Sequence, residues 1–189
     1  MDKKILQGVT LVGMWQAVQG LAVGAVFLIY GFNAALSDIL LFVAGGGGNQ
    51  SGLLFIFGAI VSGIGIFFLR GARSAVLLMR GNPNGRRLAV KFFCISTPVL
   101  VFVPILWWFL PVTVNTNYWK IFISILNVAS LVFLIHPRVK EQFTFNGDLT
   151  PQEKRIFNLL IAVLLALGTV QAVKFTLDWH KKITSERPK

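Results

Sequence analysis

Charged residues are scarce in this sequence. Asp, Glu, Lys and Arg together make up 13% of the 189 residues, about half of the roughly 25% that a soluble domain carries. So few charges leave too little polar surface to cover a water-soluble globule. The hydrophobic residues, 55% of the chain, are also gathered in long runs. Together the two features predict a membrane protein.

Cysteine is almost absent, which excludes two kinds of site. The one cysteine, Cys94, has no second cysteine for an intramolecular disulfide and no companions for a thiolate metal cluster. It stands in an apolar run, where a thiol is less reactive because apolar surroundings disfavour the thiolate. We therefore expect Cys94 to be buried and inert.

Five apolar segments are long enough to cross a bilayer, which takes about 20 residues each. They cover about 8–31, 52–70, 91–111, 119–136 and 155–176. Helix is the expected state because backbone groups in lipid must pair within the segment, and the runs lack the period-two alternation of barrel strands. The sequence predicts an all-α, polytopic integral membrane bundle of five transmembrane helices in one domain, 1–189. The alternative is four such helices plus an interfacial one.

The distribution of Lys and Arg predicts the orientation. With the N-terminus in the cytoplasm, twelve of the 18 basic residues fall on the cytoplasmic side and six outside, as the positive-inside rule favours. The first segment follows MDKK and is too long for a cleavable signal, so we expect an uncleaved signal anchor. Five crossings would place the basic C-terminal tail outside, against this rule, whereas an even number of crossings would place it in the cytoplasm.

A strongly basic connector, RGARSAVLLMRGNPNGRR, follows the second segment. Its five arginines are Arg70, Arg73, Arg80, Arg86 and Arg87. Nucleic acid is not the expected partner, because the connector has no aromatic stacking platform and no folded basic domain. Arginines beside a membrane instead contact anionic headgroups or a partner protein. We expect 70–80 to extend the second helix and 82–85 to form a turn.

Two further stretches carry local signals. Residues 33–51, which include Asp38, end in four consecutive glycines and favour a short interfacial helix with a hinge, or a re-entrant element lining a cavity. Thr150, Pro151 and Glu153 form a capping box with proline at the first helical position. They predict the start of the last helix.

Small and polar residues inside the first two segments indicate helix packing. Small-xxx-small spacing lets two helices approach closely. It pairs Gly13 with Ala17 and Gly20 with Gly24 in the first segment, and Gly58 with Ser62 and Ala59 with Gly63 in the second. Gln16 and Gln19, three residues apart, could form a polar lining. Pro98 is expected to bend the third helix.

The sequence contains no recognisable catalytic or metal-binding motif. His136 and His180 have no ligand companions at helical spacing, and we expect neither a cofactor nor an enzyme. The favoured hypothesis is a non-catalytic multi-pass protein of a cell or organelle membrane, acting as accessory or assembly subunit or scaffold of a larger complex. Its expected partners are the bilayer, anionic lipids at the cytoplasmic face and other membrane subunits. The alternative is a small channel or carrier for an apolar or weakly polar solute.

Overall fold

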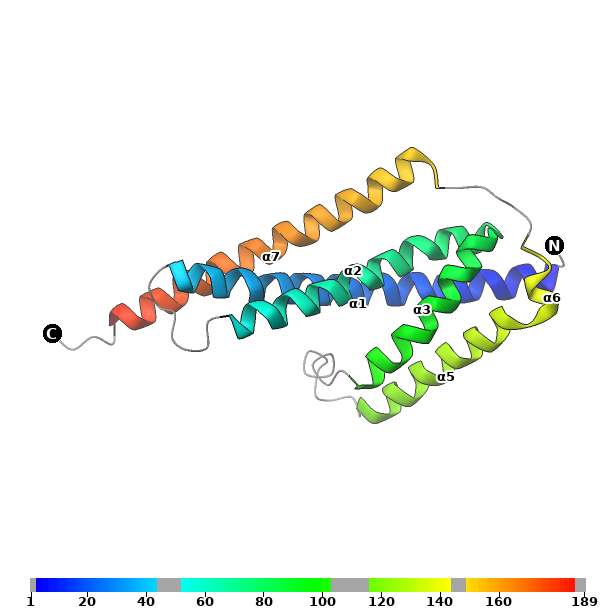
Figure 1. Ribbon diagram of the computed structural model, residues 1–189, viewed down its shortest axis with the longest axis horizontal. Helices are drawn as coiled ribbons and strands as arrows, with labels where there is room; N and C mark the ends of the chain where they lie inside the picture. The colour runs from blue at the N-terminus through cyan, green and yellow to red at the C-terminus, as the bar shows by residue number, and fades with distance from the viewer. Residues whose placement is uncertain (1–2, 44–51, 103–115, 144–148, 186–189) are drawn as a thin grey trace. The chain divides into compact units, whose positions relative to one another are not determined.

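The computed structural model describes residues 3–43, 52–102, 116–143 and 149–185, and this part of the chain contains helices and no strand (Figure 1). The helices are α1 (Lys3–Val43), α2 (Leu53–Met79), α3 (Pro83–Phe102), α5 (Thr116–Ile135), the short α6 (Pro137–Lys140) and α7 (Pro151–Ser185). The all-α prediction is confirmed for these residues.

Three of the helices are long and apolar enough to cross a membrane. They occupy Lys4–Val43, Leu53–Met79 and Pro151–Trp179. Helix α5 contains a shorter apolar stretch, Ile121–Ile135, and the end of the predicted third crossing, 103–111, lies outside the described residues. Three membrane-compatible helices are therefore established, and the full set of five crossings stays a prediction.

Helix α1 is longer than the sequence pattern suggests. It has 41 residues, about twice the number that one crossing needs, and it continues through 33–43, where we expected a separate interfacial segment. No Gly or Pro interrupts 33–43, and the Ser37 hydroxyl is satisfied within the helix by bonding the Asn33 side-chain oxygen at 3.1 Å. The glycine run at 45–48 lies outside the described residues.

The connection between α2 and α3 is a compact turn. Helix α2 extends to Met79, which confirms that the second helix continues beyond residue 70. Gly81 has a φ of 73°, a left-handed conformation that glycine adopts without strain, and the Asn82 N–H donates to the Leu77 carbonyl at 3.1 Å. The Asn82 side chain then accepts the Asn84 N–H at 2.8 Å and so caps α3. The predicted turn at 82–85 is therefore wrong in its position: the chain turns at 80–82, and 83–85 already belong to α3 because the Asn82 side chain caps the helix there.

The predicted start of the last helix is confirmed. Helix α7 begins at Pro151, and the Glu153 carboxylate accepts the Thr150 N–H at 2.9 Å. The Glu153 N–H donates back to the Thr150 hydroxyl at 3.3 Å. These reciprocal bonds satisfy two donors at the helix start.

The chain forms two compact units, and α1 and α2 each contribute to both. Unit 1 comprises 1–18 and 71–149, and unit 2 comprises 19–70 and 150–189. In unit 1, α3 and α5 pack side by side as an antiparallel pair (Figure 1). Unit 2 consists of the later part of α1, the earlier part of α2 and all of α7. The two units differ in what holds their helices together.

Candidate functional site

In unit 2, α1 and α2 approach each other at the level of the backbone. A Cβ added to Gly58 would lie 2.5 Å from the Ala35 nitrogen and 2.5 Å from the Gly31 carbonyl oxygen. One added to Gly65 would lie 2.5 Å from the Leu28 nitrogen. Cβ atoms essentially never come that close to backbone atoms. We call Gly24, Gly31, Gly58 and Gly65 the glycine seam; it allows the dispersion contacts that hold helices together in lipid.

The glycine seam includes some predicted packing residues and two that sequence reasoning missed. Gly24 faces the Leu69 backbone, Gly58 lies between the two helices, and the Ser62 nitrogen lies 2.5 Å from where a Cβ of Gly31 would stand. Four-residue spacing pairs Gly31 with Ala35 but gives Gly65 no small partner, since Val61 and Leu69 stand four residues from it. Seven-residue spacing, which also returns to one helix face, relates 24 to 31 and 58 to 65 and would have found them.

The other predicted packing residues belong to different surroundings. Gly13 lies in unit 1, where an added Cβ would be 2.4 Å from the Met79 side chain and 3.4 Å from the Ala75 carbonyl oxygen. Because the Met79 side chain is flexible, Gly13 is a less strict requirement than Gly58 or Gly65. Ala17 is half-buried and Gly20 is buried.

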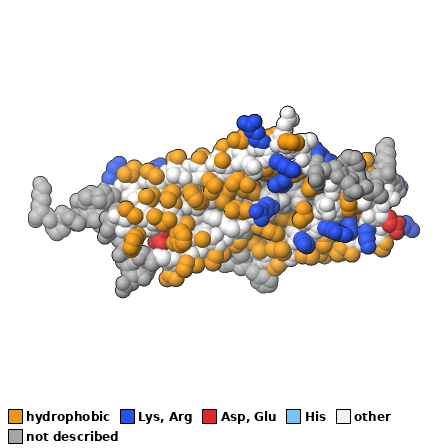
Figure 2. Space-filling view, turned by 45° about the horizontal axis from the view of Figure 1, so that its top comes forward, with side chains coloured by type: hydrophobic (Ala, Val, Ile, Leu, Met, Phe, Trp, Pro, Cys, Tyr) orange, Lys and Arg blue, Asp and Glu red, His pale blue; other side chains and the backbone are white. Residues whose placement is uncertain are grey.

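Helix α7 contacts the rest of unit 2 along one stripe. Leu164 forms a buried cluster with Leu28 and Leu69, and a Cβ on Gly168 would stand 3.1 Å from the Ile29 carbonyl oxygen. Much of the remaining surface in the middle of the helix is apolar and exposed, with the exposed side chains Ile156, Leu159, Val163, Leu167, Val170 and Val173. Hydrophobic side chains are widespread on the molecular face drawn in Figure 2. Such a surface suits lipid or another apolar helix rather than water.

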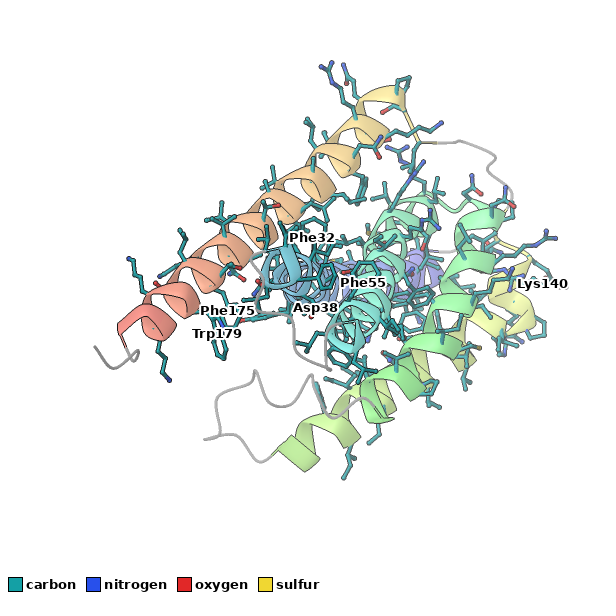
Figure 3. All side chains as sticks on the ribbon, turned by 60° about the vertical axis from the view of Figure 1, so that its left-hand side comes forward. Phe32, Asp38, Phe55, Lys140, Phe175 and Trp179 are labelled. Atoms are coloured by element: carbon teal, nitrogen blue, oxygen red, sulfur yellow. The ribbon has the colours of Figure 1, made fainter. Side chains whose placement is uncertain are left out.

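Asp38 has a structural role that its position in the sequence did not reveal. It lies within α1, not in a loop, and is 7% exposed. Its Oδ2 accepts the N–H groups of Gly52 at 2.8 Å and Phe55 at 3.1 Å (Figure 3). Gly52 directly precedes α2 and Phe55 lies in its first turn, where a helix has unpaired donors and a partial positive charge. Asp38 thus caps α2 from a neighbouring helix.

In unit 1, polar side chains join the helices. The Gln16 amide nitrogen donates to the Gly71 carbonyl at 2.9 Å and to the Ser74 hydroxyl at 2.6 Å, which links α1 to α2. The Trp15 indole donates to the Asn127 side-chain oxygen at 2.9 Å, which links α1 to α5. Gln16 and Asn127 are both fully buried.

The two glutamines proposed as a polar lining fall in different units. Gln16 belongs to unit 1, and Gln19, also buried, belongs to unit 2. Asn127 continues the unit 1 connections by donating to the Ser96 hydroxyl of α3 at 3.5 Å. Gln16 and Asn127 thus serve as links between helices.

The arginines of the basic connector have unequal roles. Arg86 donates to the Leu134 carbonyl at 3.0 Å and so satisfies an acceptor at the end of α5. Arg73 is half-buried, whereas Arg80 and Arg87 are exposed in unit 1, and Arg70 is exposed in unit 2. Arg86 is therefore a structural residue as well as a candidate for lipid contact.

Further basic residues accompany the connector in unit 1. Lys91, Arg138 and Lys140 are exposed, and among the residues described in unit 1 the one acid is Glu141. Several Lys and Arg side chains reach the molecular face drawn in Figure 2. This excess of positive charge suits anionic headgroups or an acidic partner segment.

Cys94 and Pro98 are two exposed residues of α3. Cys94 was expected to be buried but is exposed; a residue on the outward face of an apolar helix has apolar neighbours in the sequence without being covered by protein. Helix α3 continues through Pro98, which is exposed, and the Thr97 hydroxyl donates to the Phe93 carbonyl at 2.7 Å one turn earlier.

The described residues contain no group of three or more His, Cys, Asp or Glu side chains arranged to hold a metal ion. His136 is exposed where α5 gives way to α6, and the side chain of His180 lies outside the description. Comparison with protein-family models, with curated proteins and with solved structures gives no match for this chain. A functional assignment therefore depends on the chain's own geometry.

Proposed function

We propose that this chain is a non-catalytic, multi-pass membrane protein that acts by association, as an accessory or assembly subunit or scaffold of a larger membrane complex. The observation that carries the proposal is the use of the buried polar side chains. Trp15, Gln16 and Asn127 all bond groups on other helices. These bonds stabilise a framework of helices, as a subunit that acts by association requires.

Helix α7 is the proposed association surface. Its contact with unit 2 occupies one stripe, centred on Leu164 and Gly168, while Val163 and Val170 are 56% and 65% exposed. In a membrane an apolar helix surface of this kind packs against lipid or against a partner helix. An accessory subunit needs an apolar surface of this kind that is not buried within its own fold.

The proposed topology has five crossings and a cytoplasmic N-terminus. Helices α1, α2 and α7 supply three crossings, and the apolar segments 91–111 and 119–136 would supply the others. The exposed cations Arg87, Lys91 and Arg138 would then face the anionic cytoplasmic leaflet together. This arrangement also accounts for contacts with anionic lipid at that face.

Cross-linking in native membranes followed by purification in mild detergent tests the association. We expect a stoichiometric membrane partner that is lost when Val163 and Val170 are both replaced by Trp, because bulky side chains on the exposed surface of α7 obstruct helix packing. The matched control is Ile125→Trp with Val132→Trp on the exposed surface of α5, which should keep the partner. A monodisperse protein without partners, or equal loss in both variants, would refute the proposal.

One observation favours a second candidate function, a small channel or carrier for an apolar or weakly polar solute. The Gln16 side-chain oxygen is buried and accepts no hydrogen bond from the described residues, so one polar atom in unit 1 is available to a solute. Flux of small neutral solutes through liposomes holding the purified chain alone, abolished by Gln16→Leu, would establish this function. Liposomes as tight as protein-free controls would exclude it.

A further inference from the structure

The Gln16 amide is held in one orientation by its neighbours in unit 1. Its nitrogen donates to the Gly71 carbonyl at 2.9 Å and to the Ser74 hydroxyl at 2.6 Å, so both amide protons are engaged. The Ser74 hydroxyl donates to the same Gly71 carbonyl at 2.8 Å. Exchanging the amide oxygen and nitrogen would set two carbonyl oxygens against each other. The side chain therefore cannot rotate to give its oxygen a partner.

The fixed amide leaves one strong acceptor facing the protein interior. Gln16 is 0% exposed, and its Oε1 receives no hydrogen bond from any described residue. Buried polar atoms in proteins are nearly always hydrogen-bonded, to protein or to a bound molecule. Since the Ser74 proton is already engaged, the groups bonded to Gln16 cannot supply the donor from within the chain.

The charge of the surroundings limits which donor fits. The acid described in unit 1 is Glu141, which is exposed, and Gln16, Ser74 and Gly71 are all uncharged. A cation there would lack a compensating negative charge in a setting of low dielectric, which is unfavourable. An anion would be repelled by the partial negative charge of Gln16 Oε1, which has no proton to donate. The chemistry that remains is a neutral hydrogen-bond donor, of which an O–H group, as in water, is the smallest.

We propose that Gln16 Oε1 is a binding site for a neutral hydroxyl donor, either water or the hydroxyl of a small uncharged solute. Internal waters typically occupy such positions between helices and bond polar atoms that lack protein partners. The site is independent of the association function, because a donor at Gln16 is expected whether or not α7 has a partner. It gives the carrier hypothesis a defined ligand chemistry.

Asn127 provides an internal control for the test. Like Gln16 it is a fully buried primary amide of unit 1, but both ends have protein partners: its oxygen accepts the Trp15 indole and its nitrogen donates to Ser96. Because both amides are equally buried, a bound molecule that contacts Gln16 and not Asn127 would be attributed to the Gln16 oxygen, which has no protein partner among the described residues.

The experiment is magic-angle-spinning NMR of the full chain in lipid bilayers, with magnetisation transferred from water to the side-chain amides. Gln16→Met and Asn127→Leu assign the two signals by their disappearance. We expect transfer to the Gln16 amide to build up at least about threefold faster than transfer to Asn127. If transfer comes from the protons of added glycerol and not from water, the ligand is a solute hydroxyl.

Equal or slower transfer to Gln16 than to Asn127, with no contact from glycerol, would overturn the proposal. Gln16→Asn is the second variant in case Gln16→Met does not fold. It keeps an amide but draws the oxygen back by one methylene, so its signal should lose the fast transfer. Fast transfer that survives in Gln16→Asn would show that the bound molecule does not depend on the position of Oε1.

Discussion

At the scale of single residues, the tightest constraint in this protein is the absence of a side chain. At Gly58 and Gly65 the neighbouring helix contributes backbone atoms, which cannot move aside as a flexible side chain can. The nearby Gly63 differs, because a Cβ there would meet nothing within 4 Å. Three glycines of one helix thus have different requirements, and the difference is measurable.

Gly65→Ala should destabilise the protein, because its methyl group would have to displace the Leu28 backbone. We expect a loss of about 1–3 kcal/mol, the usual cost of inserting an extra group into a tightly packed contact. The measurement is the free energy of unfolding in detergent or lipid, followed by far-UV circular dichroism.

The matched control for that substitution is Gly63→Ala, two residues away on the same helix. It should be neutral or stabilising by up to about 1 kcal/mol, since alanine favours helix over glycine. Equal effects at positions 63 and 65 would contradict the close approach of α1 and α2.

At the scale of elements, helix ends are satisfied by two kinds of device. The capping box at Thr150 and Glu153 is local, with its partners three residues apart. The cap of α2 is long-range, because Asp38 reaches Gly52 and Phe55 from another helix. Local caps can be found in a sequence, and long-range caps cannot.

Asp38→Ala should weaken the start of α2. Removing the carboxylate leaves two part-buried N–H groups without that acceptor, and loss of a helix N-cap costs about 1 kcal/mol. Asp38→Asn keeps a side-chain oxygen and should cost less. Hydrogen exchange at the amides of Gly52 and Phe55 checks this, with faster exchange expected in the alanine variant.

The control for the cap is Ser37→Ala, which removes a neighbouring hydroxyl bonded within α1 itself. It should leave exchange at Gly52 and Phe55 unchanged. If both variants accelerate exchange alike, the effect comes from general loosening of α1 and not from the cap.

At the scale of the whole molecule, the distribution of charge is the basis of the proposed orientation in the membrane. The formal net charge is +11, and the exposed cations Arg87, Lys91 and Arg138 belong to unit 1. Cations retained on the cytoplasmic side fix orientation during insertion. The proposed orientation can be tested because the chain has one cysteine, Cys94, which can be replaced by serine.

In a Cys94→Ser background, Asn84→Cys places a thiol in the exposed first turn of α3. A membrane-impermeant maleimide applied to intact cells should leave this thiol unlabelled. Replacing Arg87, Lys91 and Arg138 with Gln should raise the labelled fraction severalfold, because the positive bias that holds this region inside is reduced.

The control for orientation replaces three basic residues near the other end, Lys174, Lys181 and Lys182, with Gln. Under the proposed topology these lie outside, so their removal should leave residue 84 protected. Labelling of residue 84 in the protein with its natural charges would show that the proposed orientation is wrong. Equal labelling after both triple replacements would show that Arg87, Lys91 and Arg138 do not set the orientation.

The sequence by itself determined the features that depend on composition and near neighbours. Low charge and long apolar runs predicted helices, among them the membrane-compatible α1, α2 and α7. The reason is that a long apolar segment in lipid must satisfy its backbone hydrogen bonds within itself, as a helix does. The capping box placed the start of α7, because its donors and acceptors are adjacent in the chain.

Only the tertiary structure decided which distant residues meet. It brought Gly31 to Ser62 and Gly65 to Leu28, Asp38 to the start of α2 and Arg86 to the end of α5, and it divided the chain into two units. These contacts depend on the relative position and rotation of whole helices, which local periodicity does not specify. For the same reason Cys94 is exposed on an apolar helix, because hydrophobicity alone does not distinguish a side that faces protein from one that does not.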